Sequence, residues 1–291
     1  MVRLKFSISL TYEVGNETCD FIFNLQAART HCQLVVAESL LISQSVHTDY
    51  LIDESLANRY LRLRAAPGWL NVNYEATVDV LHFFSDPGSL GEAPIAQLPM
   101  HVLPFIYPSR YCQSDRLRKL AIREFGHLQP GYWRAKAIQD WVLARTTFTS
   151  ASSDSSTSAL DTLIGQVGVC RDFAHLMIAL CRAVNIPARF VSGIDYGADP
   201  ALGPTDFHAY VEVYVGNRWY MFDPSGTATP MGFIRIGTGR DAADISFATM
   251  FGGVRTQAPV LAIEAVPDDN GFLNLPMHRN DAISTAGEFL A

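Results

Sequence analysis

Three residues in the second half of the chain have the types and the order needed for nucleophilic catalysis: Cys170, His208 and Asp223. A cysteine attacks as the thiolate, so it needs a position that favours the charged form. Cys170 follows residues 165–168 (GQVG) and begins an apolar segment, which predicts the first turn of a helix, where peptide dipoles stabilise an anion. A nucleophile of this kind also needs a base and a group that orients the base. We expect His208 to be the base and Asp223 the orienting carboxylate.

The position of His208 relative to Asp223 depends on a predicted hairpin. Gly216-Asn217 separates two β-forming runs and is a strong signal for a two-residue turn. With that turn, Val215 faces Arg218, and His208 and Asp223 become diagonal neighbours on one face of the ribbon, with Cα atoms about 7–8 Å apart. The other face is apolar and belongs to a core. A register slip of one residue would move Asp223 to the wrong face.

Each of the three residues also has an ordinary structural interpretation. A histidine at the start of a strand is commonly solvated or hydrogen-bonded, an Asp-Pro pair commonly ends a strand, and a cysteine near a helix start is commonly buried filler. His175 is a poor alternative base because it lies five residues beyond Cys170, about 140° around the helix. Asp172 suits the helix dipole, but its charge opposes a nearby thiolate unless Arg171 offsets it. We expect the remaining cysteines to be core residues: Cys19, Cys32, Cys112 and Cys181.

Period-two alternation in the first third predicts a β-sandwich-like N-terminal domain over residues 1–85. Five prolines predict an extended connector over 86–108. Residues 109–266 are expected to form an α+β core with a central helix packed on antiparallel strands, and 267–291 a C-terminal tail. Within the core, spacing predicts helices at 114–125, 133–145 and 170–184, and strands at 188–194, 209–215 and 218–222. The Ser-rich stretch 149–158 is either a solvated linker or a mobile rim beside a site.

Composition narrows the functional classes. The 291 residues are 48% hydrophobic and 18% charged, typical of a globular protein, with a net charge of −7. This charge disfavours nucleic-acid binding, and no segment predicts a membrane span or an amphipathic membrane anchor. Five scattered cysteines without zinc-like spacing favour a reduced, cytoplasmic protein with no metal or other cofactor. The oligomeric state is not readable from the sequence.

Several segments of the chain resemble the transglutaminase-like superfamily of papain-fold cysteine enzymes, in its bacterial branch. They are residues 168–176 around Cys170, 206–213 around His208 and 219–224 around Asp223. The resemblance covers about residues 108–250, and the strand-rich first third is similar to the N-terminal domain that often precedes this core. It implies a papain-like fold and a Cys170 thiolate paired with a His208 imidazolium that Asp223 orients.

The resemblance also implies a reaction in which the thiolate attacks an amide carbonyl and forms a thioester. The backbone N–H of Cys170 is expected to donate to the oxyanion, and Gln166 is a weaker candidate for the second donor. The leading prediction is a cysteine-dependent amide hydrolase or peptidase that acts on a protein or peptide. A transglutaminase, in which an amine intercepts the thioester, uses the same triad, and the absence of an EF-hand-like loop mildly favours hydrolysis. The third possibility is a non-catalytic binding or scaffold module on the same fold.

Overall fold

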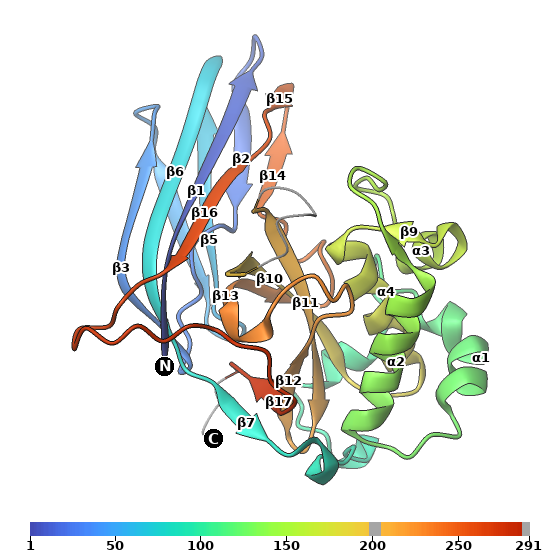
Figure 1. Ribbon diagram of the computed structural model, residues 1–291. Coiled ribbons are helices and arrows are strands. Elements are labelled where there is room, and N and C mark those ends of the chain that lie inside the picture. Colours follow the sequence, from blue (N-terminus) through green and yellow to red (C-terminus); the bar gives the residue numbers. More distant parts are fainter. Residues whose placement is uncertain (198–204, 287–291) are drawn as a thin grey trace.

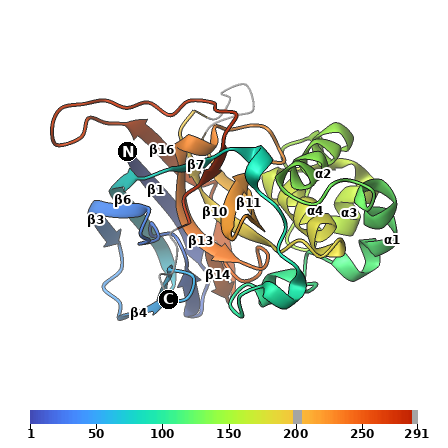
Figure 2. The same ribbon diagram turned by 90° about the horizontal axis from the view of Figure 1, so that it is seen from below.

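A computed structural model describes residues 1–197 and 205–286, which form three layers (Figures 1 and 2). A β-sandwich lies on one side, a four-stranded antiparallel sheet lies in the middle, and the helices cover the far face of that sheet. The expected architecture, a central helix packed on an antiparallel sheet and preceded by a β domain, is confirmed.

The sandwich is built from two antiparallel sheets whose inward faces form one core. One sheet has the order β15-β1-β6-β3, with β16 also paired to β1, and the other has the order β14-β2-β5-β4. In β1, alternate side chains from Leu4 to Val14 are buried, as the period-two pattern predicts. The strands are β1 Val2–Val14, β2 Cys19–Phe23, β3 Gln33–Ile42, β4 Thr48–Asp53, β5 Asn58–Ala65, β6 Gly68–Val80, β14 Ala248–Phe251, β15 Val254–Thr256 and β16 Val260–Ala265.

The last three of these strands belong to the sandwich, whereas the expected domain boundaries placed them in the core. Residues 248–265 fall in the range assigned to the core, 109–266, yet they pair with strands of the first 25 residues. Short alternating segments predict strands but do not say which sheet they join, so the sequence could not show this return. Within the expected tail, β17 (Ala282–Ser284) pairs with β7 (Phe83–Ser85).

The proline-rich connector contains three short 3-10 helices, at Pro87–Ser89, Ile95–Gln97 and Leu103–Ile106. Proline fits the first turn of such a helix because its missing N–H would have no helical partner there. The connector carries the chain along the lower end of the molecule in Figure 1 to the first long helix.

The second half supplies the helices and the middle sheet. Its helix α4 packs on β10 and β11, and twelve of its fourteen residues, Asp172 to Ala183, are buried, as expected of a helix that is apolar nearly all round. The sheet order is β12-β11-β10-β13. The elements are α1 Ser114–Phe125, α2 Tyr132–Arg145, β8 Thr147–Phe148, α3 Ala159–Gly165, β9 Val167–Gly168, α4 Cys170–Ala183, β10 Ala188–Asp195, β11 Phe207–Val215, β12 Arg218–Phe222 and β13 Phe233–Gly239.

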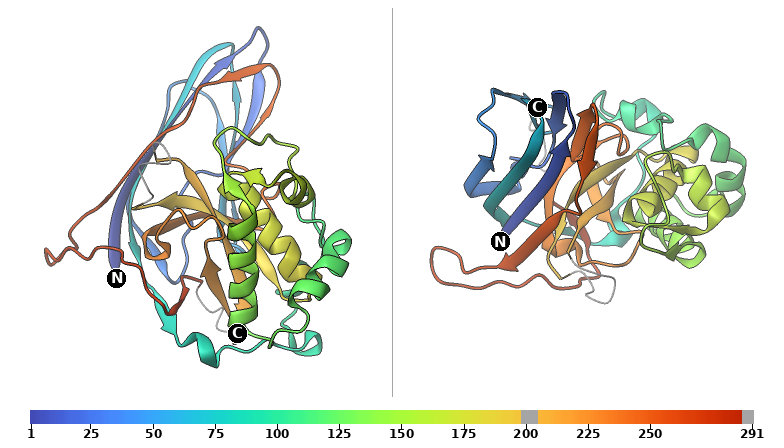
Figure 3. Two further views of the ribbon diagram at one scale, coloured as in Figure 1. Left: turned by 45° about the vertical axis from the view of Figure 1, so that its right-hand side comes forward. Right: turned by 90° about the horizontal axis from the view of Figure 1, so that it is seen from above.

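The middle sheet is shared between the two halves (Figure 3). Its face toward the helices contributes Phe190 and Val211 to the helical core, whereas Ile194 and Ile234 belong to the sandwich core. The buried side-chain amide of Gln33 fixes this contact. Its nitrogen donates to the carbonyl of Arg235 at 2.8 Å, and its oxygen accepts from the backbone N–H of Arg235.

Gly193 of β10 lies so close to the backbone of β13 that no side chain fits there. It lies opposite His208 in the β10–β11 ladder, and a Cβ at this position would stand 1.9 Å from the carbonyl oxygen of Ile234. We therefore expect Gly193→Ala to lower the free energy of unfolding in urea by about 3 kcal/mol or more, because the clash is with backbone. The matched control is Gly253→Ala, where a Cβ meets nothing within 4 Å. Equal midpoints for the two variants would contradict this reasoning.

Candidate active site

Cys170 is the first residue of α4, as predicted, and its side chain is half-buried. Its backbone N–H belongs to the first turn of the helix, where no preceding carbonyl of the helix can accept it. The sulfur lies 3.8 Å from the carbonyl oxygen of Phe207, at the start of β11. The helix start and the strand start therefore meet at the thiol.

The charge of Asp172 is compensated within the first turn of α4. Its carboxylate accepts the backbone N–H of Val169 at 2.9 Å, which satisfies a free donor at the helix end. The guanidinium of Arg171 lies 3.1 Å from the same carboxylate. Arg171 thus offsets the charge of Asp172 beside the thiol, the condition that the sequence set for a thiolate at Cys170.

The predicted hairpin register is confirmed. Val215 pairs with Arg218, and the ladder continues to Val211 and Phe222. Gly216 and Asn217 have φ values of +55° and +60°, which a two-residue turn of type I′ requires.

This register brings His208 and Asp223 together in the interior. His208 Nε2 lies 3.5 Å from Asp223 Oδ1, an ion-pair distance that is somewhat longer than a normal hydrogen bond. The side chains are only 9% and 5% exposed, so little water competes for the contact.

Asp223 is held as a carboxylate by the loop that follows it. The Ser225 hydroxyl and N–H donate to Oδ1 at 2.6 and 3.0 Å, and the Ala228 N–H donates to Oδ2 at 3.1 Å. Burial alone would raise the pKa of Asp223, but the charge of His208 and these donors hold the pKa below its usual value. Asp223 is therefore a fixed anion that can orient the imidazole.

A second carboxyl group, which the sequence analysis missed, faces the other side of His208. Asp195 Oδ2 lies 3.6 Å from His208 Nδ1, and Asp195 Oδ1 accepts a hydrogen bond of 3.0 Å from the Tyr210 hydroxyl. Asp195 Oδ2 is buried and has no hydrogen-bond partner among the residues that the structure describes. Burial, together with the charge of Asp223, raises the pKa of Asp195 to about 7, although His208 opposes the shift.

The signal for Asp195 lies in the sheet, not in a motif. Gly193 pairs with His208, so Asp195, two residues further along β10, is the diagonal neighbour of His208 on the same face. No turn dipeptide fixes the register between β10 and β11, as Gly216-Asn217 does for β11 and β12. The sequence alone therefore gave no register for this pair.

The environment of His208 favours its charged form. Burial lowers the pKa of His208, but Asp195, Asp223 and Cys170 together raise it well above its ordinary value. The imidazole thus lies between two carboxyl groups, close to the thiol, and holds a proton near neutral pH.

The raised pKa of Asp195 predicts a pH-dependent effect on stability. An unfolded aspartate titrates near 3.8, whereas folded Asp195 titrates near 7, so the native state keeps an extra proton between these values. Its contribution is present in full below pH 3.8 and is lost as the pH rises through 7. Asparagine mimics the protonated form, so the unfolding free energy of Asp195→Asn should gain about 2–4 kcal/mol over wild type between pH 4 and pH 8. Urea unfolding at both pH values tests this, and a constant difference would contradict it.

The other predicted residues fall outside the cluster around His208. Gln166 is exposed at the left-handed turn that ends α3, where its N–H donates to Thr162 O and its carbonyl accepts from Thr147, so its role as an oxyanion donor stays a prediction. His175 is buried and stacks on Tyr111, and burial lowers its pKa well below the ordinary value, so it is neutral. Cys19, Cys112 and Cys181 are buried, and Cys32 is half-buried.

The Ser-rich stretch 149–158 lies beside the site. Arg171, next to Cys170, donates to the Ser153 hydroxyl at 3.1 Å and to the carbonyl of Asp154 at 2.7 Å. Tyr111 donates to the carbonyl of Ser155 at 2.6 Å. These contacts make the segment a rim of the site.

Two protein families match the chain, one in its first third and one in its middle part. Residues 2–101 match the bacterial transglutaminase N-terminal domain, and residues 119–224 match the transglutaminase-like superfamily. The second match contains Cys170, His208 and Asp223. The chain belongs to the transglutaminase-like superfamily.

The chain is also similar to solved and curated proteins. A Cytophaga hutchinsonii protein described as a candidate cysteine protease is 36% identical, with a TM-score of 0.89 over 97% of this chain and 96% of that one. An uncharacterised Mycobacterium leprae protein is 32% identical over 115 residues, 38% of this chain and 41% of that protein. An uncharacterised protein of Mycobacterium tuberculosis is 29% identical over 143 residues, 45% of this chain and 46% of that protein. The chain thus matches less than half the length of these curated relatives.

Among the described residues, 1–197 and 205–286, no helix is long and apolar enough to cross a bilayer.

Proposed function

We propose that this protein is a cysteine-dependent amide hydrolase or peptidase in which Cys170 is the nucleophile, His208 the base and Asp223 the orienting carboxylate. The observation that supports it most is the burial of His208 3.5 Å from Asp223, beside a cysteine that begins a helix. The description of the Cytophaga hutchinsonii relative as a candidate cysteine protease points the same way.

In the proposed reaction, the Cys170 thiolate attacks the carbonyl carbon of an amide. A C–S bond forms, and the π electrons of the carbonyl move to the oxygen, which the first N–H of α4 stabilises. The C–N bond then breaks, and the leaving amine takes a proton from His208. Water gives a proton to the now neutral His208 and attacks the thioester; the C–S bond breaks, which releases the carboxylic acid and restores the thiolate–imidazolium pair. Asp223 orients the imidazole ring through both steps.

An acyl transfer to an amine needs the same residues, and only the second nucleophile differs. We place hydrolysis first because the rim segment 149–158 is largely exposed, which leaves water access from that side. A transglutaminase would need a site that excludes water while an amine enters.

The test is turnover of glutamine-containing peptide amides with and without methylamine, followed by mass spectrometry. We expect the carboxylic acid as the main product and at least a 1000-fold loss of rate in Cys170→Ala, because the nucleophile is removed. Cys32→Ala, which removes a half-buried thiol elsewhere, is the matched control. A dominant N-methylamide product would favour acyl transfer, and activity that survives in Cys170→Ala would refute the proposed function.

A further inference from the structure

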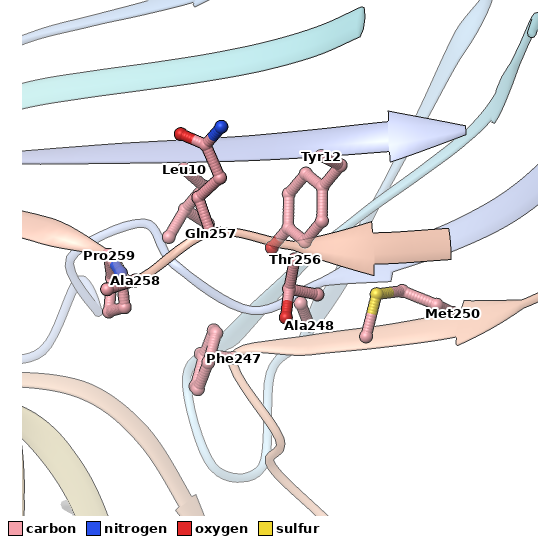
Figure 4. Close-up of a pocket in the computed structure, with 9 residues that line it drawn as sticks. All are labelled: Leu10, Tyr12, Phe247, Ala248, Met250, Thr256, Gln257, Ala258 and Pro259. Carbon is pink, nitrogen blue, oxygen red and sulfur yellow. The ribbon is translucent and has the colours of Figure 1, made fainter. Parts of the chain in front are cut away.

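A pocket of about 320 Å³ opens at the edge of the sandwich where the β1 ladder changes partner. Tyr12 pairs with Thr256 of β15 and Ser9 pairs with Val260 of β16, and after the bond from Gln257 N–H to the carbonyl of Thr11 the residues 258–259 interrupt the ladder. Pro259 has no N–H for the ladder, so the strand cannot continue through it. Figure 4 shows the lining residues of β1 on one side and those of β14 and Phe247 on the other.

Two stacked rings link the wall of the pocket to the strand that carries His208. Phe247 lines the pocket, and its ring lies 4.4 Å from that of Phe207 at an interplanar angle of 11°. The carbonyl of Phe207 contacts the sulfur of Cys170, and the next residue is His208. The pocket wall is therefore one ring contact away from the residue whose carbonyl touches the thiol.

The lining is apolar and accessible at its mouth. Phe247 and Met250, which both line the pocket, are 40% and 37% exposed. Leu10, 3% exposed, forms part of the interior wall. This combination of an exposed rim and a buried wall fits a pocket that receives an apolar group from outside.

Tyr12 adds an independent sign of a ligand. It lines the pocket and is 3% exposed, and its ring is fixed by an edge contact of 5.2 Å with Phe21. Its hydroxyl is buried, and within the described ranges 1–197 and 205–286 it has no hydrogen-bond partner, although buried hydroxyl groups are almost always paired. A polar atom of a bound molecule would complete it.

We infer that this pocket is a substrate subsite that takes a large apolar side chain, aromatic by preference, from an extended peptide, with the Tyr12 hydroxyl bonded to a polar atom of that residue. The inference rests on the proposed function for the identity of the ligand as a peptide. An aromatic side chain is favoured because Phe247 offers a ring face at the mouth and the volume suits one bulky group.

The test measures binding in the full chain with Cys170→Ala, so that no turnover is needed. The methyl signal of Met250 is followed by ¹³C NMR during titration with N-acetyl-phenylalanine amide and with N-acetyl-alanine amide. We expect a saturable shift with the phenylalanine amide and a dissociation constant about fivefold or more below that of the alanine amide, since more apolar area is buried.

Two substitutions fill the pocket from different sides. Ala248→Leu, and Thr256→Phe at an exposed position if the first does not fold, should each weaken binding of the phenylalanine amide about fivefold or more. Thr249→Leu adds the same side chain as the first variant at an exposed position of β14 that does not line the pocket, and should leave binding unchanged. An unmoved Met250 signal, or equal effects of the Ala248 and Thr249 variants, would overturn the subsite.

A second readout links the pocket to the thiol. In the protein with Cys170 intact, chloroacetyl-phenylalanine amide should alkylate Cys170 about fivefold or more faster than chloroacetyl-alanine amide, and Ala248→Leu should remove the difference. Equal rates with wild type would overturn the assignment as a subsite of this reaction. Because the NMR titration uses a protein without the thiol, failure of the proposed hydrolysis and failure of the pocket give separate results.

Discussion

Replacing His208 by alanine is expected to slow alkylation of Cys170 by iodoacetamide about tenfold to a hundredfold at pH 6. The buried imidazolium lies beside the thiol and supplies the positive charge that stabilises a thiolate there. An ordinary thiol is less than about 1% ionised at pH 6, so loss of that charge leaves little reactive species. The measurement is the alkylation rate of the Cys170 peptide against pH, by mass spectrometry, in the two proteins.

Two controls separate this effect from general unfolding. The half-buried Cys32 serves as an internal reference thiol, and its alkylation rate should be the same in wild type and His208→Ala. The variant His47→Ala removes an exposed histidine from the sandwich and should leave the alkylation rate of Cys170 unchanged. If Cys170 reacts like an ordinary or buried thiol in both proteins, the thiolate–imidazolium pair does not exist, and the non-catalytic binding module becomes the better account.

Asp195→Asn is expected to move the alkaline limb of the pH–activity profile to lower pH by about one unit and to leave the acid limb nearly in place, because Asp195 carries a proton below about pH 7. Four groups meet around the imidazole: Asp195, Asp223, Tyr210 and Cys170. Above about pH 7 the carboxylate of Asp195 favours the proton on His208. Its removal therefore makes the imidazolium lose its proton at lower pH, which is the direction any lost negative charge produces.

The profile of kcat/KM against pH, or of alkylation where no substrate turns over, measures this shift. Asp206→Asn removes an exposed carboxylate two residues before His208 and should move the alkaline limb far less, because water screens it. An alkaline limb that stays in place, or that moves to higher pH, would show that Asp195 has no electrostatic role in the reaction.

The hairpin shows what sequence could supply about the site. Gly216 and Asn217 can adopt positive φ at low cost, so their presence fixed the turn type, the turn fixed the register, and the register put His208 near Asp223. The position of Cys170 could also be predicted, because an apolar segment with a clear start defines the N-terminal end of a helix. In both cases a local rule was sufficient.

The place of Asp195 beside His208 and the pairing of β14–β16 could not be predicted from the sequence, for a common reason. Both depend on pairing between segments that no short turn connects. Local patterns specify that a segment is a strand, but the free energy that selects its partner comes from packing across the whole sheet. The pocket at Tyr12 has the same origin, because it exists only where β1 passes from β15 to β16.

The return of β14–β16 to the first sheets has a consequence for how the protein is made. During synthesis, β1 leaves the ribosome about 250 residues before its neighbours β15 and β16, so one edge of β1 stays open until the helices and the middle sheet have emerged. An unpaired strand of this length is a template for association with other chains. Nascent or truncated forms that stop before residue 248 should consequently depend on chaperones.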